Sequence, residues 1–384
     1  MSEREADRAQ TISTYELLER SARSAIDLQR EDGSFPPARN GVYDEQETPL
    51  RTTARWLTVL AEVYDHTDGE EFQRAANDAV DFLISDAVRP HGYTFEARLQ
   101  GGDLCDGLVG QSGPIQSLAH AGDILDRKEA IDVAIDVFTT LPFNEDLGLW
   151  EIVETNGLKR SFDRTLNHQL LFAAAGTQLI PESGQIQDDI QDFLEQLPQI
   201  MHTHEDGVVR HYIRPPVTTV VKTVVLEPRH WPLLQNETVF HYYARSQDRR
   251  VKEIGYHTTV LGALSRIKRN LPNHSVWEQQ PIKSALQFTN TSQYKKQIRE
   301  QYSPYGSMLT GIGFARILDA FEGAPVQRLQ KWVQLDIDRT YDPETGLLTK
   351  DAADPIFQSS CVNSLVELPE ILIQLPTESN NRTY

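Results

Sequence analysis

Segments with helical periodicity, each roughly 15 to 20 residues long, recur along the chain and alternate between two types. The first type is amphipathic and is predicted at 12–30, 70–87, 128–141, 184–201, 275–289 and 325–336. The second type carries apolar and small residues on nearly all of its faces, which is typical of helices buried on every side. It is predicted at 50–64, 108–125, 164–179, 254–267, 307–321 and 357–372. Six such pairs predict an all-α fold, an (α/α)6 toroid whose inner helices line a central funnel.

The repeat is interrupted once. Successive inner helices are predicted to start about 50 to 58 residues apart, except for one step of about 90 residues that holds an insertion from about 206 to 246. Its β-branched and aromatic runs at 217–225 and 239–243 predict strands. This β-rich insertion could cover a barrel end, form an oligomer contact or act as a lid over the funnel. Because nothing resembles a domain linker, we expect one domain over 1–384.

The charge of the chain restricts its partners. It has 37 Lys and Arg against 56 Asp and Glu, a formal net charge of −19. Such a field repels phosphate backbones and anionic membranes, so we expect neither nucleic acid binding nor membrane insertion. Abundant Arg, few Lys and many carboxylates resemble the proteomes of extreme halophiles, so we interpret the charge as an adaptation to solvent.

The cellular compartment is predicted from three features. Cys105 and Cys361 are the only cysteines, which indicates a reducing compartment. The acidic N-terminus has no apolar signal region, and the most apolar run, 170–180, is too short to cross a bilayer. We therefore expect a cytoplasmic protein.

One rim of the toroid is expected to carry the site, because the N-terminal ends of the inner helices meet there and their partial positive charge favours anions. Carboxylates, arginines and aromatic rings are predicted along this rim, and together they suit a sugar: rings stack on sugar faces, carboxylates move protons and Arg pairs with a uronate carboxylate. The candidate substrate-binding residues are Arg51, Arg98, Arg164, Trp150, Gln111, His257 and Tyr305.

Two aspartates are the candidate catalytic carboxylates. Asp106 and Asp163 stand at the starts of the second and third inner helices, which are neighbours in the ring, so they can face each other across a sugar-sized gap. They could divide acid and base roles if their surroundings separate their pKa values. Either could instead be an ordinary N-cap. His168 shares a helical face with Arg164 and is a third candidate for proton transfer.

Other chemistries have weaker support. His202, His204 and His211 with Glu205 lack a recognised metal spacing, and no pattern of His and Asn accompanies Cys105 as a nucleophile. Neither GxGxxG nor GxxxxGK[ST] occurs. We expect no metal and no cofactor.

Three motifs carry a family resemblance: Asp106-Gly107-Leu108-Val109-Gly110-Gln111, Gly148-Leu149-Trp150 and the run from Ser161 to Gln169. Through them the chain resembles the AglQ proteins of haloarchaeal N-glycosylation gene clusters over most of its length. More distantly it is similar to the six-hairpin glycosidases that include the unsaturated glucuronyl hydrolases. That match implies Asp163 as general acid/base with Asp106 as its partner. The chain differs from the hydrolases at two places. It has Cys105-Asp106 where they have a His-Asp pair, and it lacks their later Gly-Gln-Trp segment.

The resemblance implies action on a hexuronic acid of the N-linked glycan of a surface-layer glycoprotein. We therefore expect an isomerase or epimerase of a nucleotide-linked or lipid-linked hexuronic acid, working beside other glycosylation-pathway enzymes. The alternatives are a glycoside hydrolase of the six-hairpin type and a non-catalytic glycan-binding or assembly factor. A toroid resembling terpenoid cyclases is also conceivable, but the Asp-rich metal motif of that chemistry is missing.

Overall fold

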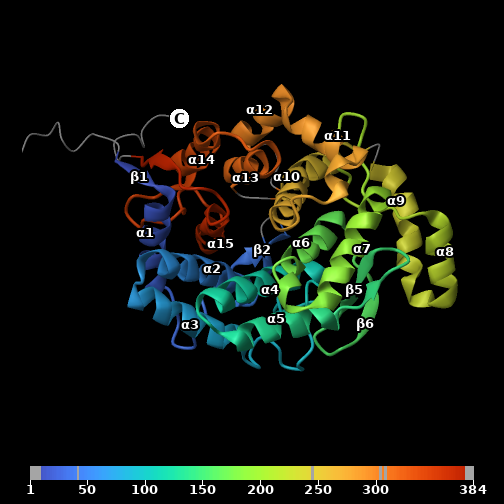
Figure 1. Ribbon diagram of the computed structural model, residues 1–384, viewed down its shortest axis with the longest axis horizontal. Helices are drawn as coiled ribbons and strands as arrows, with labels where there is room; N and C mark the ends of the chain where they lie inside the picture. The colour runs from blue at the N-terminus through green and yellow to red at the C-terminus, as the bar shows by residue number, and fades with distance from the viewer. Residues whose placement is uncertain (1–9, 41–42, 244–245, 302–304, 307–308, 377–384) are drawn as a thin grey trace, which may run out of the picture.

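The computed structural model describes residues 10–40, 43–243, 246–301, 305–306 and 309–376. Its inner helices are α2 (Leu50–Thr67), α4 (Gly107–Ile124), α6 (Leu166–Gly176), α10 (Gln247–Asn270), α13 (Thr310–Glu322) and α15 (Pro355–Ser360), the last continued by the 3-10 helix η5 (Cys361–Leu365). Each packs on the next, and α15 and η5 return to α2, so the ring closes (Figure 1). The predicted (α/α)6 toroid is confirmed.

The outer helices surround this ring (Figure 1). They are α1 (Thr14–Ile26), α3 (Glu70–Ile84), α5 (Lys128–Thr140), α7 (Gly184–Ile200), α11 (Gln280–Thr289), α12 (Ser292–Glu300) and α14 (Val326–Thr340). Each buries one stripe, as α3 does with Phe72, Ala76 and Val80, whereas α4 is buried on most of its surface. Small residues allow close packing of inner on outer helices: a Cβ on Gly311 of α13 would lie 2.3 Å from the Trp332 carbonyl oxygen of α14.

Short sheets join the helices. β1 (Thr11–Ser13) pairs antiparallel with β7 (Leu372–Gln374), which places Ile12 opposite Ile373 and ties the two ends of the described chain together. β2 (Arg39–Asn40) pairs with β3 (Glu45–Gln46). β4 (Phe143–Asn144), β5 (Leu149–Val153) and β6 (Lys159–Phe162) form a sheet that leads into α6.

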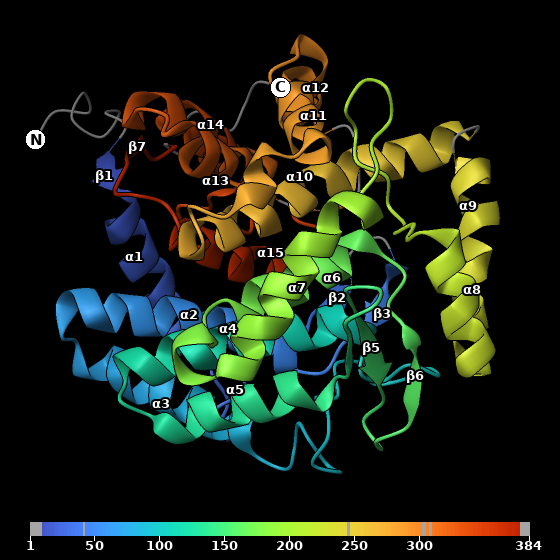
Figure 2. The ribbon, with the colours of Figure 1, turned by 45° about the vertical axis from the view of Figure 1, so that its right-hand side comes forward.

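The insertion differs from its prediction. The two runs expected to be strands lie in α8 (Val217–Leu226) and α9 (Gln235–Tyr243), and the 3-10 helix η3 (Pro228–Leu234) joins them. Val220 and Thr223 are buried at helical spacing, so tertiary packing overrides the β propensity of the branched residues. η3 packs on β6, and α8 and α9 form a layer on one side of the barrel (Figure 2).

The last inner helix is also shorter than predicted. The expected helix over 357–372 ends with η5 at Leu365, because Pro369 cannot continue a helix and restricts the residue before it. Residues 307 and 308 of the fifth predicted inner helix lie outside the described residues. None of the described helices has the length and apolarity needed to span a membrane.

Candidate functional site

The carboxylate of Asp163 lies against the start of α4. Its Oδ2 accepts hydrogen bonds from His168 Nδ1 at 2.8 Å and from the Leu108 amide at 3.3 Å, and its Oδ1 accepts from the hydroxyl of Thr165 at 2.9 Å. Gly107 makes this approach possible, since its φ is +54° and a Cβ there would lie 2.6 Å from Oδ2. The two neighbouring inner helices are thus joined at the rim by a direct contact of Asp163 with the start of α4.

Asp163 and His168 form an ion pair. Burial raises the pKa of Asp163, but the charge and hydrogen bond of His168 outweigh it and leave that pKa below its usual value. Burial lowers the pKa of His168, but the negative charges of Asp163 and Asp106 outweigh it and leave that pKa above its usual value. The carboxylate of Asp163 therefore favours the protonated form of His168.

Asp106 stands at the N-cap position of α4, but its side chain makes no capping hydrogen bond and binds two arginines instead. Its φ is +52°, its Oδ2 pairs with Arg51 and its Oδ1 with Arg98. Arg51 also pairs with Glu47, and Arg98 with Glu45 at 3.1 Å. The two predicted arginines are therefore at the rim, but their charges are already matched by carboxylates.

A second histidine faces this group. The ring of His211 stacks on Tyr256 with centroids 4.9 Å apart, and its carbonyl accepts a hydrogen bond from the Leu166 amide at 2.9 Å. Burial, then the positive charges of Lys252 and His168, lower the pKa of His211 to about 3. A neutral imidazole thus lies near the protonated one. The sequence grouped His211 with candidate metal ligands, and no local pattern linked it to His168.

Three tyrosines and a lysine continue the site. The hydroxyls of Tyr43 and Tyr256 are 3.4 Å apart, and the ring centroid of Tyr305 is 6.3 Å from each of their rings. The Lys252 ammonium lies 5.5, 5.7 and 5.7 Å from the rings of Tyr43, Tyr256 and Tyr305. The structure therefore places Tyr305 in this cluster, whereas Tyr43, Tyr256 and Lys252 were not among the predicted site residues.

Trp150, Gln111 and His257 were expected to bind substrate, and the structure contradicts this for all three because each is fully buried. Gln111 bonds the backbone of Phe95 and Cys105, and the His257 ring accepts from the Val209 amide. Trp150 packs in an aromatic cluster with Phe138, Phe143, Phe172 and Phe193. These side chains hold the rim loops on the inner helices instead of lining the funnel.

Arg164 has a structural partner as well. It was expected to hold a uronate, but its guanidinium donates to the Pro232 carbonyl at 3.0 Å and to the Gln235 side chain at 3.1 Å. Arg229 makes a two-pronged pair with Glu151 of β5, at 2.7 and 3.0 Å. These contacts fix the segment 217–243, which we call the cover, against the rim.

The metal ligands that the sequence suggested do not converge in the part of the chain that the structure describes. His202 contacts the Arg214 carbonyl and His204 contacts Glu253, so neither shares a ligand cluster with His211 among the described residues. Cys105 is buried 3.2 Å from Asp103, and both burial and that charge raise the pKa of its thiol, which disfavours a nucleophilic role.

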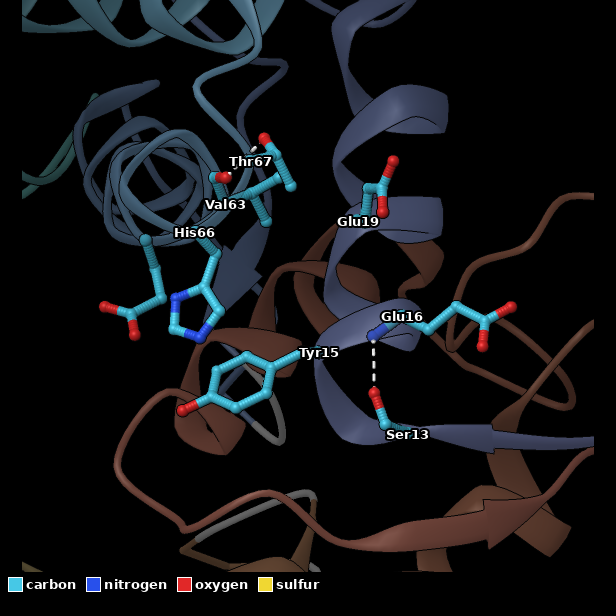
Figure 3. A pocket seen from close by; sticks show the side chains of 8 residues that line it. Ser13, Tyr15, Glu16, Glu19, Val63, His66 and Thr67 are labelled. Atoms are coloured by element: carbon cyan, nitrogen blue, oxygen red, sulfur yellow. Dashed lines mark hydrogen bonds between the residues drawn. The ribbon is translucent and has the colours of Figure 1, made fainter.

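A cavity of about 230 Å³ lies elsewhere, between α1 and the C-terminal end of α2 (Figure 3). The rings of Tyr15 and His66 stack there with centroids 4.0 Å apart, and Glu16, Glu19 and Glu62 line it. Since the rim residues lie at the N-terminal ends of the inner helices, this cavity is separate from the candidate site.

The fold is shared with solved structures of several enzymes that act on sugars. Cellobiose 2-epimerase from Bacillus thermoamylovorans is 12% identical with a TM-score of 0.61 over 92% of this chain and 98% of that one. A D-mannose isomerase is 14% identical with a TM-score of 0.60 over 92% and 96%. An α-1,6-mannanase of Salegentibacter is 12% identical with a TM-score of 0.56 over 92% and 98%. At these identities the likeness shows the fold alone.

The sequence gives a closer relationship. The chain is 36% identical over 348 residues to archaeal glycosylation protein Q of Haloferax volcanii, covering 89% of this chain and 94% of that protein. It therefore belongs to the family of archaeal glycosylation protein Q, and the predicted resemblance is confirmed. No protein-family model matches the chain.

Proposed function

We propose that this protein is an isomerase or epimerase of an acidic sugar, a hexuronic acid in nucleotide-linked or lipid-linked form, in the N-glycosylation of a surface-layer glycoprotein. One observation carries the proposal. His168 and His211 both lie at the rim, the charge of His168 acts on His211, and their pKa values are moved in opposite directions, one above and one far below the usual value. Two groups whose pKa values are moved apart in this way are suited to act as acid and base on one substrate.

The reaction needs only proton transfer. His211, with its lone pair, accepts a proton from the carbon next to a carbonyl, and the electron pair of that C–H bond moves to the carbonyl oxygen to give an enediolate. Protonated His168 then returns a proton to the opposite face of the same carbon, or to the former carbonyl carbon while the hydroxyl proton of the first carbon moves to the former carbonyl oxygen. The first outcome is epimerisation and the second isomerisation, and neither consumes an oxidant or a reductant.

The two aspartates have different tasks in this scheme. Asp163 keeps His168 charged and oriented, so it is a positioning residue. Asp106 holds Arg51 and Arg98 with both of its oxygens, and we assign it the same kind of role. The general acid/base task that the sequence suggested for the aspartates passes to the histidines.

Hydrolysis is less well supported. A glycoside hydrolase needs one carboxyl group that stays protonated to donate to the leaving oxygen. The pKa of Asp163 lies below its usual value, and Asp106 is bound by two guanidinium groups. Asp163 is suited to remain a carboxylate, and both oxygens of Asp106 are already engaged by arginines, which favours isomerisation over hydrolysis. A purely binding protein would not need histidines with opposed pKa shifts.

The test is incubation of the purified protein with hexuronic acid donors in deuterated water, followed by NMR. We expect deuterium at a single ring carbon, and loss of this exchange in both His168→Gln and His211→Gln. His91→Gln, a change at an exposed loop histidine, is the matched control and retains exchange. Undiminished exchange in both site variants, or release of free sugar from a uronate oligosaccharide, would contradict the proposal.

A further inference from the structure

The arginines near the rim have partners within the protein. Arg51 is bound by Asp106 and Glu47, and Arg98 by Asp106 and Glu45. Arg164 bonds the cover. A substrate carboxylate or phosphate that approached these groups would compete with contacts already made, so another cation is needed to bind an anionic ligand.

Lys252 is one such cation, and its charge acts on His211. Among the described residues, no carboxylate oxygen lies within 4.0 Å of its ammonium, which instead lies near three tyrosine rings at 5.5 to 5.7 Å. Aromatic rings attract and orient a cation without cancelling its charge. Lys252 therefore combines a fixed position with an unmatched charge, in a chain whose formal net charge is −19.

The tyrosine rings also connect Lys252 to the histidine pair. Tyr256 packs against His211 at 4.9 Å between centroids, and its ring lies 5.7 Å from the Lys252 ammonium. Tyr256 and Lys252 both lie in α10, one turn apart and close to the N-terminal end that faces the rim. The positive charge of Lys252 also contributes to the lowered pKa of His211, as expected for groups that border one site.

We propose that Lys252, held by Tyr43, Tyr256 and Tyr305, binds the anionic group of the substrate and selects acidic over neutral sugars. The inference rests on the proposed function for its choice of a sugar as ligand. The anionic group could be the carboxylate of a uronic acid or a phosphate of the carrier, and a compact ammonium can bind either.

Binding at Lys252 would also act on the chemistry. An anion beside the ammonium offsets one of the positive charges that disfavour protonation of His211. The neutral imidazole then accepts a proton more readily when an acidic sugar is present than when a neutral sugar is present. Lys252 thus links recognition of the acid to activation of the base.

The test compares three probes, D-glucuronate, D-glucose 1-phosphate and D-glucose, by isothermal titration calorimetry and by NMR titration. We expect Lys252→Met to weaken binding of at least one anionic probe tenfold or more and to leave glucose binding unchanged. A loss confined to glucuronate identifies the carboxylate as the ligand group, and a loss confined to glucose 1-phosphate identifies the phosphate. Lys252→Arg, which keeps the charge, should retain most of the affinity for that anion.

Lys222→Met is the matched control, because Lys222 is an exposed lysine of α8 that pairs with Asp146 at 2.9 Å. It should bind all probes as the wild type does. Unchanged affinity for both anions in Lys252→Met, or an equal loss for all three probes, would overturn the inference. Thermal melting checks that each variant is folded. Since binding is measured without turnover, lack of deuterium exchange would reject the proposed reaction and still leave this inference open to its own test.

Discussion

His168 Nδ1 lies 2.8 Å from Asp163 Oδ2, so the imidazole at the head of α6 is held by the carboxylate that also contacts the first turn of α4. The interaction connects two inner helices and sets the charge of a candidate catalytic group. Because of this double role, stability and chemistry must be measured separately in any variant of the pair.

The first prediction concerns pH. The charge of Asp163 outweighs the burial that lowers the pKa of His168, so Asp163→Asn should lower that pKa. A step that needs protonated His168 is lost as pH rises through its folded-state pKa, and in the variant this loss occurs at a lower pH. NMR titration of the imidazole and the pH dependence of exchange measure both effects. The control Asp338→Asn, a change at an exposed residue, should alter neither the pKa of His168 nor the pH dependence of exchange. An unchanged pKa of His168 in Asp163→Asn would refute the prediction.

A second prediction separates structure from catalysis at Asp106. Its side chain is only 5% exposed, and Asp106→Asn removes the carboxylate charge that pairs with Arg51 and Arg98. Breaking such buried pairs should lower the free energy of unfolding by about 3 kcal/mol, measured by urea denaturation. Asp44→Asn, which breaks an exposed pair with Arg39, should cost less than about 1 kcal/mol. A loss of activity in Asp106→Asn without any loss of stability would instead favour a direct catalytic role.

The third prediction concerns the cover. Glu151→Gln removes the charge that binds Arg229 of η3, so the cover should open more often. Amide hydrogen exchange should become faster in 217–243 and stay unchanged in α3. Asp146→Asn removes only the exposed contact to Lys222 and should leave exchange in the cover nearly as in the wild type. Equal acceleration in both variants would show that the buried pair is not what fixes the cover.

The toroid was predictable because its helices differ in burial, and burial determines both periodicity and residue size. Gly311 in α13 shows the cause directly, since a Cβ there would lie 2.3 Å from the Trp332 carbonyl oxygen of α14, and an inner helix that packs against a neighbouring backbone can carry only small residues there. The helices of the cover were not predictable in the same way. Val217, Val221 and Val225 are 47%, 46% and 75% exposed, so these residues give a β-like composition without the burial that usually accompanies it.

The site was predicted in part. The arginines and aspartates at the starts of neighbouring inner helices meet, because position along the chain fixes which rim a residue occupies. It does not fix whether a side chain points to the funnel or into the wall, and Trp150 and Gln111 point into the wall. Lys252 joins tyrosines from two distant loops only when the ring closes, so no local pattern could indicate it.

The final prediction concerns a buried acid remote from the histidines. Asp336 of α14 is completely buried, and burial raises its pKa to about 7, although its Oδ2 accepts a hydrogen bond from the Ile312 amide at 2.8 Å. The folded state therefore holds a proton that the unfolded chain releases near pH 4. Stability from this group is complete below that pH and decreases as pH rises to about 7, by roughly 4 kcal/mol in total.

Asp336→Asn removes the ionisation and keeps an oxygen for the Ile312 amide. The variant should therefore be more stable than the wild type above pH 7, and this advantage should shrink steadily toward pH 4. Urea denaturation at a series of pH values, with Asp338→Asn on the same helix as control, measures the difference. A stability difference that is constant across pH would mean that Asp336 ionises in the folded protein as freely as in the unfolded chain, because only a shifted pKa makes the difference vary with pH.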